Sequence, residues 1–228
     1  MTSNVLLTEL PPLGVDKIEK KRFPLKKFVL YRSEPIREAI LIYIIGAGGF
    51  GREVLNIYID LGREEEVAGF LIENCDKHGA KINEKPLHDI TLLDKIEMSD
   101  VKLTCAIGTP LRKRLIENTK NKGYNYDSVI HPSVIKSRWV AFGEGTIICA
   151  GNIFTSQIKV GDYSIVNLSC TIGHDVEIGK CTTISPGVNI SGRVTIGDEC
   201  FIGTGVSIIE KITTVSYTHL TLPTILLV

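Results

Sequence analysis

Residues 166–208 read VNLSCTIGHDVEIGKCTTISPGVNISGRVTIGDECFIGTGVSI, and this stretch has a period of six. An aliphatic or Phe residue occupies every sixth position, and the series extends upstream to Phe142 without a slip. Its twelve members are Phe142, Ile148, Phe154, Val160, Val166, Ile172, Ile178, Ile184, Ile190, Ile196, Ile202 and Ile208. A second, mostly small or β-branched set follows four positions later: Thr146, Asn152, Ile158, Ser164, Cys170, Val176, Thr182, Val188, Val194, Cys200, Val206 and Ile212. Such a fixed short period indicates a repeat architecture.

The period of six excludes an amphipathic helix, whose period is 3.6, and an ordinary array of hairpins. It is typical of short flat strands joined at repeated corners, where Gly and Asp/Asn tolerate the tight backbone. Gly often follows the aliphatic position, as at Gly161, Gly179 and Gly197. The pattern resembles the left-handed hexapeptide β-helix family, which has three hexads per coil, so that twelve hexads imply four coils. The alternative, chance alternation in an all-β sandwich, does not account for twelve in-frame positions.

Upstream of the repeat, strands and helices are expected to alternate. The apolar run Ile42–Ile45 precedes GAGGFG at residues 46–51, a GxGxxG pattern, and a helix is expected behind it over Arg52–Leu61. Glycines in such a loop let the backbone approach a pyrophosphate at the helix N-terminus. Further strands are expected at Val67–Leu71 and Val101–Ile107, and a further helix at Leu111–Asn121. This alternation predicts a small α/β, Rossmann-like half domain with a parallel sheet.

A single GxGxxG leaves three interpretations open. The loop is a tight strand-to-helix turn without a ligand, or it holds NAD, or it holds a mononucleotide such as a UDP-sugar. Only residues 52–141 lie between the loop and the hexads, which is room for half of a dinucleotide fold and favours the mononucleotide.

Composition narrows the classes of function. Lys+Arg and Asp+Glu number 26 each, so that no net charge favours nucleic-acid binding. No apolar run approaches the roughly 18 residues of a membrane span, and no signal peptide is recognisable. The six cysteines form no CxxC pair, and we interpret them as reduced core residues rather than as disulfides or zinc ligands. These features predict a cytoplasmic enzyme without a nucleic-acid partner or a membrane span.

Five motifs in a fixed order carry a more specific resemblance. They are IYIIGAGGFGREV (42–54), AIGTPLRKRL (106–115), SVIHPSV (128–134), NLSCTIGHDVEIGK (167–180) and ISPGVNISGRVTIGDECFIGTGVSII (184–209). Together they resemble the NeuD/PglD-type sugar O-/N-acetyltransferases. The resemblance implies that the first domain binds a sugar or sugar nucleotide and that the β-helix binds acetyl-CoA, without a metal. It also implies a homotrimer with active sites between adjacent β-helices, acting in glycan or surface-polysaccharide biosynthesis.

The resemblance places the catalytic His at His174 and its acidic partner at Asp175. An amine or hydroxyl that attacks a thioester must lose a proton, and imidazole is suited to take it near neutral pH. A neighbouring carboxylate orients the ring and stabilises the imidazolium. Outside this motif, a lone corner His would be interpreted as a solvated surface residue. His131 is interpreted as the corner that opens the β-helix.

Further site residues are carried over by motif. On the substrate side they are Gly48, Gly49, Phe50, Glu73 and Gly108, and for acetyl-CoA they are Thr183, Gly192 and Thr204. The glycines are equally compatible with purely structural corners. Two departures stand out: Thr183 occupies a position where some relatives have a second His, and Ile72 precedes Glu73 where relatives tend to have two acidic residues.

Four segments are expected: an N-terminal extension over 1–40 of doubtful authenticity, the sugar-nucleotide-binding domain over 41–128, the β-helix over 129–213, and a tail over 214–228. The tail shows no hexad frame, and we expect it to be artefactual and the chain to be C-terminally truncated. The alternative to an acetyltransferase is a non-catalytic sugar-nucleotide-binding scaffold of the same fold. A nicotinamide-dependent enzyme fused to a trimerising β-helix is the third possibility.

Overall fold

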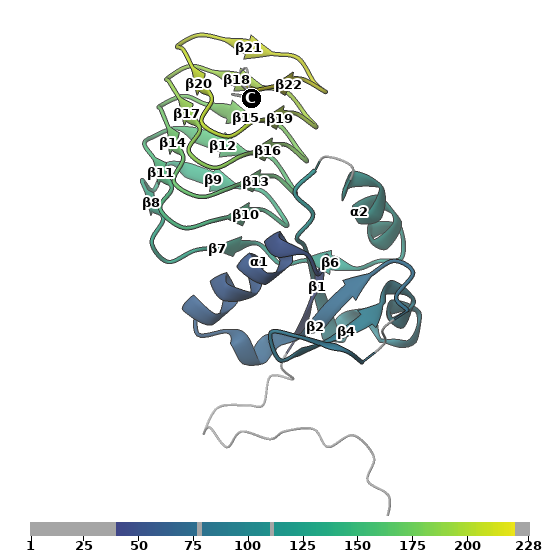
Figure 1. Ribbon diagram of the computed structural model, residues 1–228. Coiled ribbons are helices and arrows are strands. Elements are labelled where there is room, and N and C mark those ends of the chain that lie inside the picture. Colours follow the sequence, from purple (N-terminus) through teal and green to yellow (C-terminus); the bar gives the residue numbers. More distant parts are fainter. Residues whose placement is uncertain (1–39, 77–78, 110–111, 222–228) are drawn as a thin grey trace, which may run out of the picture. The chain divides into compact units, whose positions relative to one another are not determined.

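The computed structural model describes residues 40–76, 79–109 and 112–221 (Figure 1). The N-terminal extension up to residue 39 and the last seven residues lie outside this range. Within it, a mixed α/β part comes first and a stack of short parallel strands follows, which confirms the predicted fold class.

The α/β part contains one six-stranded sheet in the order β3-β4-β2-β1-β5-β6. Its strands are β1 Leu41–Ile45, β2 Val67–Ile72, β3 Lys81–Ile82, β4 Lys85–Asp89, β5 Val101–Cys105 and β6 Asn125–Tyr126. Its helices are α1 Gly49–Asp60 and α2 Arg112–Asn121, with 3-10 turns η1 Glu64–Glu66, η2 Ile90–Lys95 and η3 Met98–Asp100. All strand pairs are parallel except β3 with β4.

Helix α1 is buried along one face because its apolar residues recur at helical spacing. Val54, Leu55 and Tyr58 are buried and belong to a cluster that also holds Ile42 and Ile44 of β1. The same cluster includes Val129, Ile147, Cys149 and Ile165 from the first coils of the β-helix. Helix α1 therefore packs against both the sheet and the coils, and this apolar cluster joins the two parts.

The remaining strands stack into three parallel sheets. Their orders are β22-β19-β16-β13-β10-β7, β20-β17-β14-β11-β8 and β21-β18-β15-β12-β9. The strands are β7 Val129–Ile130, β8 Ile135–Lys136, β9 Val140–Phe142, β10 Ile147–Ile148, β11 Ile153–Phe154, β12 Ile158–Val160, β13 Ile165–Val166, β14 Thr171–Ile172, β15 Glu177–Ile178, β16 Thr183–Ile184, β17 Asn189–Ile190, β18 Thr195–Ile196, β19 Phe201–Ile202, β20 Ser207–Ile208, β21 Thr213–Thr214 and β22 His219–Leu220. Paired residues are 18 positions apart, as Ile147 and Ile165 are, so that each coil consists of three hexads.

Both sets of the repeat point inward, but they stabilise the coil differently. The aliphatic set and the apolar members of the second set together form the apolar column. Polar members of the second set are buried and bind backbone at the corners: Ser164 Oγ donates to Gly179 O at 2.7 Å and accepts from Thr182 N at 3.0 Å. Thr182 repeats this one coil on, with Gly197 O and Cys200 N. Small hydroxyl residues recur there because they satisfy buried backbone groups that would otherwise lack partners.

The glycines after the aliphatic position have a different role from the one expected. Gly161, Gly179 and Gly197 are absent from the positive-φ positions, which fall on other corner residues such as Tyr163 and Cys181. A Cβ on Gly179 would instead lie 2.5 Å from the backbone of Gly197 in the next coil. These glycines are therefore needed for the close approach of successive coils and not for an unusual corner conformation.

The coils also continue beyond Thr213, where the sequence suggested that the repeat stops. Strand β21 pairs with β18, and His219 and Leu220 of β22 pair with Phe201 and Ile202 of β19. The aliphatic position is Thr214 in one hexad and Leu220 in the next, so that one polar but β-branched residue obscured the frame. The described part of the predicted tail, up to residue 221, is thus built as a further coil.

Candidate functional site

The strongest chemical feature of the β-helix is the pair His174 and Asp175, at the corner that follows β14. His174 Nδ1 lies 2.8 Å from Asp175 Oδ2, and both side chains are about half exposed. Asp175 has a positive φ of 59°, and its backbone N–H donates to Ser156 O at 3.0 Å in the preceding coil. With Nδ1–H donating to the carboxylate, the other ring nitrogen, Nε2, is left as a proton acceptor.

The His174 ring lies over Gly192, the equivalent corner residue of the next coil. A Cβ built on Gly192 would be 2.7 Å from both Cε1 and Nε2 of His174. The backbone N–H of Arg193 donates to His174 O at 2.8 Å, which holds the two corners together. The missing side chain at residue 192 therefore makes the room in which the imidazole lies.

Because His174 is the predicted base and its ring would have to move, we expect Gly192→Ala to lower the rate of acetyl transfer by about 10-fold or more, since small displacements of reacting groups cost up to about 10²-fold. The fold should survive, since the clashing atoms are the end of a mobile side chain. Steady-state kinetics of the variant, alone and combined with His174→Ala, test this. A further loss in the His174→Ala background would show that the methyl group acts by another route.

The residues that were predicted to bind the substrate lie at the carboxyl edge of the first sheet. Gly48, Gly49 and Phe50 follow β1, with Gly48 as the N-cap of α1, and Gly108 follows β5, the neighbour of β1 in the sheet. Gly48, Gly49 and Gly108 have open space where a side chain would be, whereas a Cβ on Gly51 would lie 2.1 Å from Gly46 O. The first group leaves room for a ligand at a helix N-terminus, and Gly51 is required for the turn itself.

Glu73 lies at the same edge, after β2, but its carboxylate is already engaged. Glu73 Oε2 accepts from Arg114 Nη2 of α2 at 2.7 Å. Both side chains are well exposed, so the ion pair is weak and open to competition by a ligand. Arg114 is a residue of this edge that the sequence did not single out.

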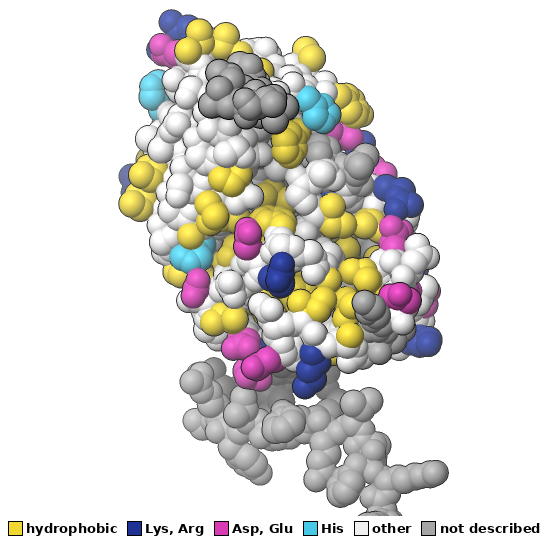
Figure 2. Space-filling view, in the orientation of Figure 1, with side chains coloured by type: hydrophobic (Ala, Val, Ile, Leu, Met, Phe, Trp, Pro, Cys, Tyr) yellow, Lys and Arg dark blue, Asp and Glu magenta, His cyan; other side chains and the backbone are white. Residues whose placement is uncertain are grey.

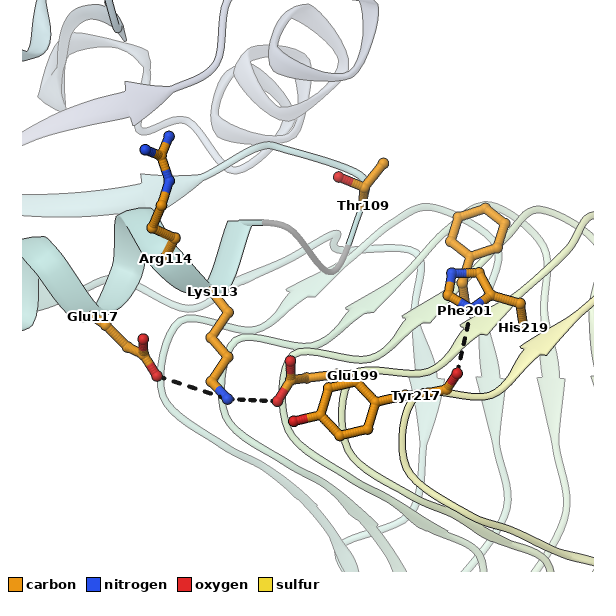
Figure 3. Close-up of a pocket in the computed structure, with 8 residues that line it drawn as sticks. All are labelled: Thr109, Lys113, Arg114, Glu117, Glu199, Phe201, Tyr217 and His219. Atoms are coloured by element: carbon orange, nitrogen blue, oxygen red, sulfur yellow. Dashed lines mark hydrogen bonds and ion pairs between the residues drawn. The ribbon is translucent and has the colours of Figure 1, made fainter.

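Arg114 also belongs to the wall of a cleft of about 690 Å³ between α2 and the outer face of the β-helix (Figure 3). In that view Lys113 extends from α2 toward the coils, where its Nζ lies 2.6 Å from Glu199 and 3.8 Å from Glu117. The cleft is lined by Thr109, Lys113, Arg114, Glu117, Glu199, Phe201, Tyr217 and His219. Thr109 directly follows Gly108, so the cleft begins at the edge that carries the residues predicted to bind the substrate.

Thr183 does not meet the expectation of an open acetyl-CoA contact. It is 3% exposed, and its Oγ1 accepts from Arg112 Nη1 at 2.8 Å. It belongs to β16, whereas His174 follows β14 in another sheet. Within this chain its hydroxyl therefore stabilises a buried arginine and offers little surface to a ligand. Thr204 is exposed at the corner after β19, and the structure does not bring it to the His174 corner.

Arg112 is a buried residue that no motif in the sequence indicated. Its guanidinium donates to four oxygens: Thr109 O at 2.9 Å, Tyr163 O at 3.0 Å, Thr182 O at 3.0 Å and Thr183 Oγ1. Burial lowers its pKa to about 10, so that it stays protonated at neutral pH. It joins the start of α2 to three residues of the coils.

His131 has the structural place that we expected for it. Nε2 lies 3.0 Å from Asp60 Oδ2 at the end of α1, and Nδ1 lies 2.7 Å from Ser133 Oγ. The ring thus bridges the last residue of α1 and the corner after β7.

On the face shown in Figure 2, the Lys and Arg side chains of the described residues are dispersed and do not form a basic patch. Within residues 40–76, 79–109 and 112–221, no cluster of three His, Cys, Asp or Glu could hold a metal ion. In the same ranges no helix is long and apolar enough to cross a membrane.

Comparison with known proteins supports the resemblance seen in the motifs. Residues 41–119 match the family model of the PglD N-terminal domain. GDP-perosamine N-acetyltransferase of Escherichia coli O157:H7 is 26% identical over 168 residues, which are 72% of this chain and 76% of that protein. The acetyltransferase domain of PglB from Neisseria gonorrhoeae FA1090 superposes with a TM-score of 0.71 at 28% identity, covering 79% of this chain and 87% of that one. A GDP-perosamine N-acetyltransferase mutant from Caulobacter crescentus, in complex with CoA and GDP-perosamine, has a TM-score of 0.64 at 23% identity over 76% and 90% of the two chains, and shows the same fold.

Proposed function

We propose that this chain, as a NeuD/PglD-type sugar acetyltransferase, transfers the acetyl group of acetyl-CoA to an amino or hydroxyl group of a nucleotide-linked amino sugar or a sialic-acid-like sugar. The observation that carries the proposal is the 2.8 Å contact between His174 Nδ1 and Asp175 at a corner of a hexapeptide β-helix. The Escherichia coli relative is named as an N-acetyltransferase of a GDP-sugar, and the Caulobacter structure holds both CoA and GDP-perosamine.

In this mechanism the nucleophile belongs to the substrate. His174 Nε2 takes the proton from the attacking amine or hydroxyl as its nitrogen or oxygen bonds to the thioester carbon. Asp175 stabilises the imidazolium that forms. When the tetrahedral intermediate collapses, the C–S bond breaks and the proton passes from the imidazolium to the CoA sulfur. No covalent enzyme intermediate is formed.

The substrate would bind at the carboxyl edge of the first sheet. The N-terminus of α1 at Gly48 and Gly49 suits a phosphate, since its first N–H groups lack helical partners. Arg114 adds a cation at the same edge through its exposed pair with Glu73. The resemblance implies trimers with sites between neighbouring β-helices, and we propose the same here. In support, Ile135, Ile153 and Leu168 expose apolar side chains on the coils. Action in the cytoplasm stays a prediction.

The decisive experiment measures thiol release from acetyl-CoA against a panel of UDP- and GDP-linked amino sugars and free sialic acid. We expect release that depends on one class of sugar and an acetylated product of matching mass. Binding of a sugar nucleotide, seen as a raised melting temperature, without any release from acetyl-CoA would favour the scaffold alternative. Stabilisation by NAD alone would favour the nicotinamide enzyme.

A further inference from the structure

A second ion pair lies at the His174 corner, farther along the stack of coils. Arg193, next to Gly192, donates from Nε to Glu210 Oε1 at 3.1 Å, and its Nη2 contacts the same oxygen. Residues 174, 192 and 210 are equivalent corner positions in three successive coils. Backbone hydrogen bonds from Arg193 N to His174 O and from Lys211 N to Gly192 O hold these corners in line.

Gly192 leaves the space between the imidazole and Glu210 free of a side chain. The His174 ring occupies the near side of that space. Beyond it, the pKa of Glu210 lies below its usual value because Arg193 hydrogen-bonds to the carboxylate and attracts it, with smaller effects from Lys211 and His174. The pKa of Arg193 is raised by Glu210 and, more weakly, by Asp175. Asp175 contacts the imidazole directly, and Arg193, Glu210 and Lys211 are charged groups near the same corner among the described residues.

This arrangement has a chemical consequence for the base. Asp175 holds Nδ1, so Nε2 must remain unprotonated to accept the proton of the substrate. An unpaired carboxylate across Gly192 would favour a protonated Nε2 and compete with the substrate for it. Two nitrogens of the Arg193 guanidinium contact one oxygen of that carboxylate, so that its negative charge is paired by Arg193.

We propose that Arg193 is a positioning residue that keeps Glu210 away from His174 and so keeps Nε2 open as the proton acceptor. The role in acyl transfer rests on the proposed function, whereas the electrostatic coupling between these side chains does not. The acceptor nitrogen is therefore set by two ion pairs in successive coils, His174 with Asp175 and Arg193 with Glu210.

Arg193→Gln removes a positive charge near His174 and leaves the Glu210 carboxylate without its partner. We expect the pH at which the His174 signals titrate to rise by about half a pH unit or more, which is the scale of solvent-exposed unit charges several ångströms apart. Glu210→Gln should shift the titration in the opposite direction, and the double variant should return close to the original. Arg138→Gln is the matched control, because Arg138 is an exposed arginine at the same corner of an earlier coil, stacked on Trp139.

The experiment is an NMR titration of the full chain labelled at its five histidines, with His174 assigned by its loss in His174→Asn. The acid limb of kcat/KM should move with the titration. An unchanged titration in Arg193→Gln, or an equal change in Arg138→Gln, overturns the inference even if acetyl transfer proceeds normally. A shifted titration without acetyl transfer to any sugar supports the electrostatic coupling between Arg193, Glu210 and His174 and contradicts the proposed function instead. Circular dichroism checks that each variant is folded.

Discussion

Replacing His174 by alanine is expected to lower kcat/KM for sugar acetylation by about 10²–10⁴-fold, the range that general-base catalysis contributes. The substrate amine or hydroxyl would then lose its proton to water, and Asp175 would have no imidazolium to stabilise. Because His174 is about half exposed at a corner, the loss should be catalytic and not structural. Thiol release from acetyl-CoA measures the rate, and urea unfolding measures the stability.

The matched control is Ser156→Ala, the equivalent corner residue one coil earlier. Ser156 contributes its backbone O to Asp175 N, and this bond survives the change. We expect the rate of Ser156→Ala to stay within a few-fold of the unmodified chain. If His174→Ala retains full turnover, another group is the base, and the mechanism proposed for the His174–Asp175 pair is wrong.

Replacing Arg112 by alanine is expected to destabilise the chain by about 2–4 kcal/mol. The change removes the guanidinium donor from Tyr163 O and from the Thr183 hydroxyl, and it removes one of two donors from Thr109 O and Thr182 O, which each keep a backbone N–H partner. Part of that cost is offset, because the variant no longer buries a positive charge. In the unmodified chain the desolvated guanidinium has no carboxylate partner among the described residues. The free energy of unfolding in urea, extrapolated to water, gives the value.

Arg114→Ala supplies the comparison for this prediction. Arg114 lies two residues along the same helix, and its pair with Glu73 is exposed, so that its loss should cost less than about 1 kcal/mol. Similar costs for the two variants would mean that Arg112 is not the link between α2 and the coils.

The fold was predictable because its signal is repeated. Twelve aliphatic positions at a fixed spacing each report the same inward contact, and the strand register confirms it, since paired residues such as Ile147 and Ile165 are 18 positions apart. The His174–Asp175 pair could be proposed because it lies within a local motif. The space at Gly192 and the burial of Thr183 could not, because they depend on which side chain of a neighbouring coil or helix occupies the adjacent volume.

Two further features had weak sequence signals. Arg112 stands in the run Arg112-Lys113-Arg114, where a solvated basic face is the ordinary interpretation, and only the tertiary structure separates the buried arginine from its exposed neighbours. The coil after Thr213 was hidden by Thr214, a polar residue with a shape close to that of valine. Allowing β-branched polar residues at the aliphatic position would have extended the frame to Leu220.

The burial of the cysteines decides how the chain behaves toward disulfide reagents. Five of the six thiols are buried, and desolvation raises the pKa of Cys105 and Cys149 to about 12 and that of Cys170 to about 11. Since only thiolates react with an aromatic disulfide such as Ellman's reagent, the native chain should be almost silent and Cys75, which is half-buried, should give most of the background. The absorbance that develops during turnover then comes from the thiol of coenzyme A. A slow rise toward six reacted thiols per chain reports unfolding of the chain.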